Sequence, residues 1–121
     1  MTQGYLYFNS ILYLLFALWC TVGWQSTSTR LGYLTLANGG RSEYLVIYGG
    51  LQIGLAILFF LLARNATYFK LGLLISIGLY APIVIFRVIT VLMNWPVSGL
   101  TLATGGLESI LLIGALWLRY L

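Results

Sequence analysis

The sequence has 121 residues, of which 61% are hydrophobic and only 7% are charged. Because a soluble domain usually carries about a quarter charged residues, this composition excludes an ordinary soluble fold and indicates a chain embedded in lipid. The net charge of +4 comes from basic residues scattered singly, which gives no cluster suited to a nucleic-acid backbone. We expect one transmembrane domain over residues 1–121 and no nucleic-acid partner.

The first apolar segment runs from about Tyr5 to Trp24, and its length suits a membrane-spanning helix, which needs roughly 20 residues. No basic leader precedes it and no small-x-small cleavage pattern follows it, so we expect a retained helix rather than a cleaved signal. The single cysteine, Cys20, lies in this segment, and the sequence contains no histidine. Histidine is the commonest haem, copper or zinc ligand, so we predict no metal site and no cofactor.

Three further apolar segments have spanning length, at about Glu43 to Ala63, Leu71 to Met93 and Leu102 to Leu118. A polar loop over residues 25–42, a short basic turn over residues 64–70 and the breaker Asn94-Trp95-Pro96 separate the four segments. The segment Leu31 to Ala37 is compatible with an interfacial or a re-entrant piece, and the sequence does not distinguish them. The expected fold is all-α, an antiparallel four-helix bundle.

Four spans place both termini and the basic turn on the same side of the membrane. That side carries Arg64, Lys70 and Arg119, whereas the opposite side carries Arg30 and Arg41 together with Glu43. Because short cytoplasmic loops are enriched in lysine and arginine, we expect both termini in the cytoplasm. The expected location is the inner (plasma) membrane, which the chain crosses several times.

Small residues at helical spacing predict where helices pack closely, because a missing side chain lets two backbones approach. Gly50 and Gly54 form a GxxxG pair, and Gly105 with Ser109 forms a second small-xxx-small pair. The favoured interpretation is close packing inside one bundle. The alternative is a face that pairs two copies of the chain.

Two opposite charges stand in the last two apolar segments. Arg87 precedes Met93 by six residues and Glu108 follows Leu102 by six residues, which places each about 9 Å from the connecting turn at 1.5 Å per residue. Since a lone charge inside a bilayer costs several kcal/mol and a paired charge costs far less, we predict an intramembrane ion pair between Arg87 and Glu108.

Further polar side chains are expected at the same depth. Tyr48 and Gln52 share a helix face at a spacing of four residues, and Glu43 opens the same predicted helix. Together with Arg87 and Glu108, these side chains would enclose a polar cavity in the outer half of the membrane, with Tyr80 as a further contributor. The pair would then fix helix register, bind a ligand in this cavity, or take part in ion translocation.

Evidence for catalysis or transport is weak in this sequence. Asn9 and Tyr13 are the only polar candidates in the inner half of the first helix, and we expect them to be isolated. No Ser-His-Asp set, Cys-His pair or phosphate-binding glycine loop occurs. We therefore assign no catalytic residue.

The segments "RSEYLVIYGGLQIGLAILFFLLAR" and "FRVITVLMNWPVSGLTLATGGLESILLIGALWL" carry an informative constellation: Glu43, Tyr48-Gly49-Gly50, Arg87 and Glu108. This pattern resembles small bacterial four-helix membrane proteins of unknown function in the DoxX/DoxD-like superfamily. That family often has an arginine shortly after the first acid, whereas Tyr44 and Leu45 follow Glu43 here. The resemblance implies a four-helix bundle and no particular reaction. Some relatives look like accessory subunits of membrane redox enzymes for quinone or thiosulfate chemistry.

Three functions follow as hypotheses from this reading. The first is a non-catalytic accessory or scaffolding subunit of a membrane complex, whose partners are lipids and other membrane subunits or a second copy. The second is a protein that binds a small molecule, lipid or quinone in the polar cavity. The third is an enzyme or transporter, which would lose its turnover or flux in Glu108→Gln.

Overall fold

The computed structural model describes residues 1–120, and every regular element in this range is helical. The elements are, in chain order, α1 (Thr2–Val22), α2 (Trp24–Arg30), α3 (Asn38–Leu45), η1 (Val46–Leu51), α4 (Gln52–Ala63), η2 (Ala66–Tyr68), α5 (Phe69–Met93) and α6 (Gly99–Tyr120). Four helical stretches within this range are long and apolar enough to cross a membrane. This pattern indicates a multi-pass membrane protein.

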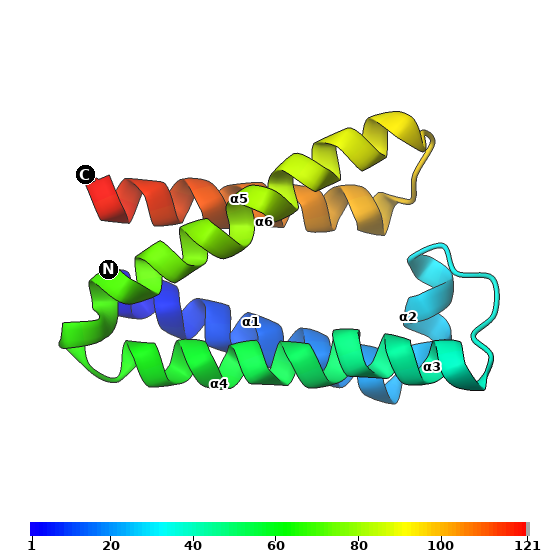
Figure 1. Ribbon diagram of the computed structural model, residues 1–121, viewed down its shortest axis with the longest axis horizontal. Helices are drawn as coiled ribbons and strands as arrows, with labels where there is room; N and C mark the ends of the chain where they lie inside the picture. Colours follow the sequence, from blue (N-terminus) through cyan, green and yellow to red (C-terminus); the bar gives the residue numbers. More distant parts are fainter. Residues whose placement is uncertain (121) are drawn as a thin grey trace.

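The helix pair α1 and α4 forms the better-packed part of the molecule. These helices lie side by side, and the chain runs in opposite directions along them (Figure 1). Leu6, Phe59, Leu62 and Ala63 form the buried apolar cluster between them. The hydroxyl of Ser10 adds a hydrogen bond of 2.7 Å to the carbonyl oxygen of Ala56, which is how hydroxyl groups commonly join helices in lipid.

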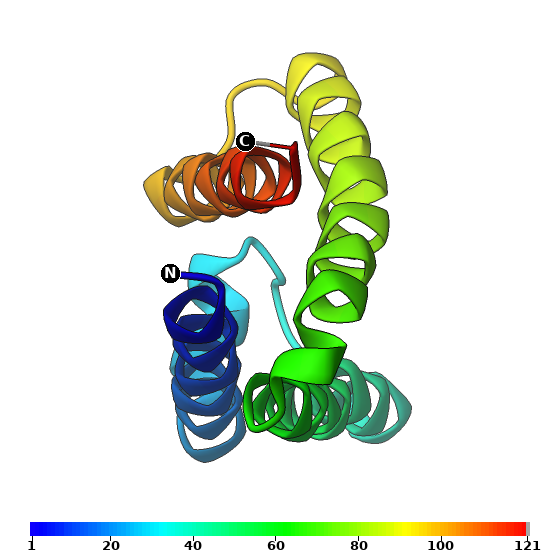
Figure 2. The same ribbon diagram turned by 90° about the vertical axis from the view of Figure 1, so that its left-hand side faces the viewer.

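The helices α5 and α6 form a second pair that is much less covered. Figure 2 shows α5 leaning away from the end of α4 toward α6, with α6 set apart from α1 and α4 over much of its length. In each of these two spans only 11% of an apolar 18-residue stretch is buried. The corresponding share is 28% in the first span and 22% in the second. Both termini lie at the same end of the molecule (Figure 1).

The second span begins earlier than predicted, because α3 starts at Asn38 rather than at Glu43. It is also interrupted by a π-helical segment, η1, over Val46–Leu51. Within this segment the backbone at Gly49 approaches α1 closely: a Cβ atom there would lie 2.6 Å from Oγ1 of Thr21. A π-turn inserts one extra residue into a helix, so side chains on either side of η1 no longer share the face that an uninterrupted α-helix would give them.

The loop after the first span folds back over this interrupted helix. In α2, the hydroxyl oxygen of Thr27 lies 2.8 Å from the phenol oxygen of Tyr44. The ring of Tyr44 stacks on Tyr48 with a centroid distance of 4.5 Å and meets Tyr33 edge-on at 5.7 Å. The first part of the loop is therefore a short helix. In the segment Leu31 to Ala37, which the sequence left open, Tyr33 packs against the second span.

Candidate functional site: a salt bridge in a hollow between α5 and α6

Arg87 in α5 and Glu108 in α6 contact each other, as their spacing from the turn predicts. The guanidinium donates two hydrogen bonds to the carboxylate, from Nε to Oε2 at 3.0 Å and from Nη2 to Oε1 at 2.7 Å. This bidentate geometry is the strongest that arginine and a carboxylate make. The arginine side chain is 32% exposed and the glutamate side chain 15% exposed, so the pair is partly open to the surroundings.

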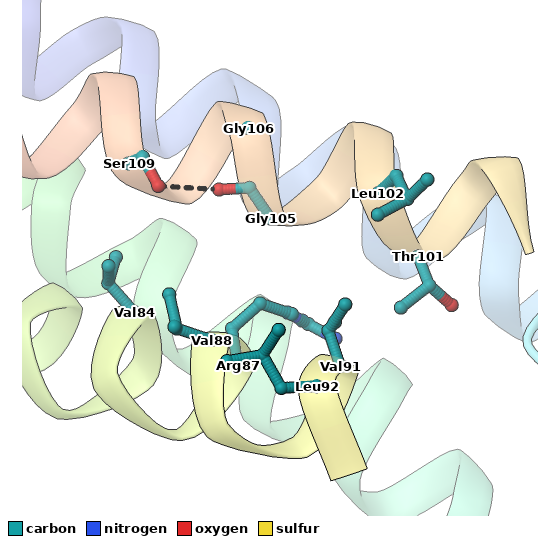
Figure 3. Close-up of a pocket in the computed structure, with 10 residues that line it drawn as sticks. All are labelled: Val84, Arg87, Val88, Val91, Leu92, Thr101, Leu102, Gly105, Gly106 and Ser109. Atoms are coloured by element: carbon teal, nitrogen blue, oxygen red, sulfur yellow. Dashed lines mark hydrogen bonds between the residues drawn. The ribbon is translucent and has the colours of Figure 1, made fainter. Parts of the chain in front are cut away.

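Glycine at position 105 lets the arginine reach its partner. A Cβ atom on Gly105 would lie 3.0 Å from Cγ and 3.3 Å from Cδ of Arg87, so the arginine stem lies directly against the glycine backbone. The hydroxyl of Ser109 donates to the carbonyl oxygen of Gly105 at 2.9 Å (Figure 3). Of the predicted packing pair, Gly105 therefore contacts the neighbouring helix, while Ser109 bonds within its own helix.

We expect Gly105→Ala to destabilise the protein by about 1 kcal/mol, because the added methyl group displaces the arginine stem and strains the salt bridge. Gly106→Ala is the matched control, since a Cβ atom there meets nothing within 4 Å. Thermal unfolding in detergent measures both variants. Equal melting temperatures for the two would contradict this role of Gly105.

A hollow of about 260 Å³ opens beside the arginine. Figure 3 shows its walls, which come from α5 and α6 and consist mainly of aliphatic side chains such as Val84, Val88 and Leu102. Its polar groups are Arg87, Thr101 and Ser109. Because Glu108 engages only Nε and Nη2, N–H groups of the guanidinium remain without a carboxylate partner. The hollow can therefore accept an apolar group that carries a hydrogen-bond acceptor.

The other predicted cavity residues do not join this site. Glu43 is exposed, and its carboxylate forms no hydrogen bond or ion pair with any of residues 1–120. Gln52 donates from Nε2 to the carbonyl oxygen of Ile47 at 3.3 Å, five residues earlier, as the π-helical register of η1 allows. Tyr48 packs its ring on Tyr44 and against Phe16. The predicted cavity assumed an uninterrupted α-helix. With η1 in place, Tyr48 stays within electrostatic reach of Arg87 but makes no hydrogen bond to it.

A second polar cluster lies around the buried side chains of Asn9 and Tyr80, where the sequence suggested isolated residues. The phenol of Tyr13 donates to that of Tyr80 at 2.8 Å, and Tyr80 in turn donates to Oδ1 of Asn9. Asn9 also donates from Nδ2 to the carbonyl oxygen of Tyr5 at 2.9 Å. The prediction that Asn9 and Tyr13 stand alone is wrong, and Tyr80 forms its hydrogen bonds within this cluster rather than with Arg87 or Glu108.

Periodicity in the sequence could have revealed this cluster. Polar or small residues recur every four positions on the first and third spans, at Tyr5, Asn9 and Tyr13 and at Gly72, Ser76 and Tyr80. Residues at this spacing share one helix face, so two such faces are natural partners. Tyr5 extends the contact to the last helix through a hydrogen bond of 2.7 Å from its hydroxyl to the carbonyl oxygen of Leu111.

The GxxxG pair does not pack against another helix of this chain. A Cβ atom added at Gly50 or Gly54 would meet nothing within 4 Å. The interpretation that these glycines serve close packing inside the bundle is therefore wrong for this pair. Their face of the second span is exposed and bears aliphatic side chains, among them Val46 and Ile57.

Comparisons with known proteins add no family to this description. No family model, no curated protein and no solved structure matches the chain. Within residues 1–120 no group of three or more His, Cys, Asp or Glu side chains lies close enough together to hold a metal ion. The interpretation of the site therefore depends on its own geometry.

Proposed function

We propose that this chain is a non-catalytic accessory or scaffolding subunit of a membrane complex, and that the α5–α6 face is where a protein partner docks. The supporting observation is the combination of a partly exposed salt bridge with two spans that the chain itself barely covers. In a bilayer, charged side chains almost always face protein or water rather than acyl chains. A partner surface over this face would shield the pair and supply an acceptor for the free N–H groups of Arg87.

The membrane arrangement that accompanies this proposal is an antiparallel four-helix bundle in the inner membrane, with both termini in the cytoplasm. The position of both chain ends at one end of the molecule supports it (Figure 1). The positive charges of Arg64, Lys70 and Arg119 also favour this orientation. A relationship to the DoxX/DoxD-like superfamily, suggested by Tyr48-Gly49-Gly50 and the two paired charges, is part of the same proposal.

Photocrosslinking in native membranes tests the docking proposal. A photoreactive amino acid is placed at Ile113 on the exposed surface of α6, and at Leu61 on the exposed surface of α4 as the control. We expect a discrete protein adduct from position 113 and only lipid adducts from position 61. An adduct of twice the chain mass would identify a second copy as the partner.

A specificity control uses the hollow itself. Val88 is 54% exposed and lines the hollow, so Val88→Trp would block a partner without disturbing the interior of the chain. We expect the position-113 adduct to disappear in this variant. Lipid adducts alone at position 113 in the unmodified chain would refute a docking role for the α5–α6 face.

A second candidate function, binding of a small molecule, lipid or quinone, is supported by the hollow of about 260 Å³ beside Arg87. Its aliphatic walls and donor groups fit a neutral apolar compound with a carbonyl oxygen. Mass spectrometry of an organic extract of the purified chain tests this candidate. We expect a compound present in stoichiometric amount that is lost in Val88→Trp, and an extract with the same lipids from both proteins would argue against it.

A further inference from the structure

A second hollow lies at the opposite end of the second span from its connection to α5. It is a shallow, open depression of about 500 Å³ along one face of the second span, lined by Asn38, Arg41, Ser42, Leu45, Val46 and Gly50. It shares no lining residue with the hollow beside Arg87. Its polarity changes along the helix, with three polar side chains at the start of α3 followed by three aliphatic or small residues.

The polar end of this hollow holds a positioned cation without an anionic partner. The guanidinium of Arg41 lies 5.0 Å from the ring centroid of Trp24, in a cation–π contact. Within residues 1–120 the side chain of Arg41 forms no salt bridge, and the nearby acid Glu43 is not among the lining residues. The hollow therefore presents a positive charge beside an amide and a hydroxyl group, and no carboxylate opposes it.

The apolar end is open and smooth because of glycine. A Cβ atom on Gly50 would meet nothing within 4 Å. The surface at this position is therefore formed by the helix backbone, one turn beyond Leu45 and Val46. From Asn38 to Gly50 the helix advances by about 18 Å at 1.5 Å per residue. This length reaches from the headgroup level of a bilayer into its hydrocarbon core, whose full thickness is roughly 30 Å.

We propose that this hollow binds an anionic phospholipid, with the phosphate at Arg41, Asn38 and Ser42 and an acyl chain along Leu45, Val46 and Gly50. Charge complementarity favours an anionic headgroup, because an arginine near a bilayer surface attracts anionic lipid. The apolar floor favours a lipid over a free phosphate ion, which would use only the polar end. The site is independent of any partner on the α5–α6 face.

The headgroup contact is tested by native mass spectrometry of the full chain in detergent. Phosphatidylglycerol and phosphatidylcholine with identical acyl chains are added in turn. We expect tighter binding of phosphatidylglycerol, and a loss of about five-fold in its affinity in Arg41→Gln, as one arginine near a headgroup contributes. Arg30→Gln is the control, since Arg30 is exposed but does not line the hollow.

Equal affinity for the two lipids, or equal affinity of Arg41→Gln and the unmodified chain for phosphatidylglycerol, would overturn the proposal. Inorganic phosphate serves as the competitor that separates the two sources of a phosphate group. Displacement of the lipid by millimolar phosphate would assign the site to a free anion instead. Circular dichroism of each variant verifies that the helices are intact.

The acyl-chain contact has its own test in Gly50→Leu, which adds an apolar side chain at a position where a Cβ atom meets nothing within 4 Å. We expect this variant to lose phosphatidylglycerol binding at least as strongly as Arg41→Gln. Gly78→Leu is the matched control, because Gly78 on α5 is also open and lies outside the hollow. Unchanged lipid binding in Gly50→Leu would show that no acyl chain occupies this surface.

Discussion

Arg87→Ala should lower the free energy of unfolding by about 3 kcal/mol, because removing one member of a shielded ion pair strands the other. Glu108 accepts both of its hydrogen bonds from this arginine and is only 15% exposed. Truncation also removes the stem that packs on Gly105. Reversible unfolding in mixed micelles measures the change.

The double variant Arg87→Met with Glu108→Leu separates the cost of a stranded charge from the value of the pair. Replacing both members of a shielded pair by apolar residues is often neutral or even stabilising, so we expect it to be more stable than either single replacement. A double variant less stable than both singles would show that the two side chains stabilise the protein independently and that the stranded-charge explanation fails.

Tyr80→Phe should destabilise the protein by about 2 kcal/mol, because the lost hydroxyl group is the centre of the buried polar cluster. Tyr80 is only 1% exposed and bonds to both Tyr13 and Asn9. Its removal leaves two polar groups without this partner in a region that lipid and protein keep dry. Thermal unfolding and amide hydrogen exchange of α1 measure the effect.

Two further variants decide whether the effect comes from hydrogen bonding. Tyr68→Phe is the control, because Tyr68 is 47% exposed and its hydroxyl forms no hydrogen bond with residues 1–120. The combination Tyr80→Phe with Asn9→Leu removes both the donor and the acceptor of the Tyr80–Asn9 hydrogen bond. We expect this double variant to recover part of the stability lost in Tyr80→Phe. If Tyr80→Phe and Tyr68→Phe lower the unfolding temperature equally, the hydrogen bonds of the Tyr80 hydroxyl do not stabilise the protein and only the packing of its ring does.

The sequence was sufficient to predict the helical class, the four spans and the contact of Arg87 with Glu108. These features follow from the length of apolar segments and from the distance of each charge to one connecting turn, quantities that local deviations hardly change. The ends of the spans were less predictable. Asn38-Gly39-Gly40 has the composition of a turn, yet it forms the first turn of α3, where the N–H groups need no helical partner.

The failed part of the site prediction has one main cause, the π-helical segment η1. Assigning Glu43, Tyr48 and Gln52 to one face requires a constant 3.6-residue period, and a single extra residue in a turn rotates everything beyond it. Gly49 lies within this segment, and its backbone lies against Thr21 in α1. This contact is tertiary, so the sequence of the second span alone does not contain it.

The hydrogen bond from Tyr5 to Leu111 joins positions 106 residues apart, whereas the α5–α6 pair closes over the short connection of residues 94–98. Contacts between distant positions carry the greatest entropic penalty and form last. The bond from the Tyr5 phenol to the carbonyl oxygen of Leu111 thus forms only when the final helix docks. A chain truncated before α6 would therefore lack the hydrogen bond that ties its first span to its last.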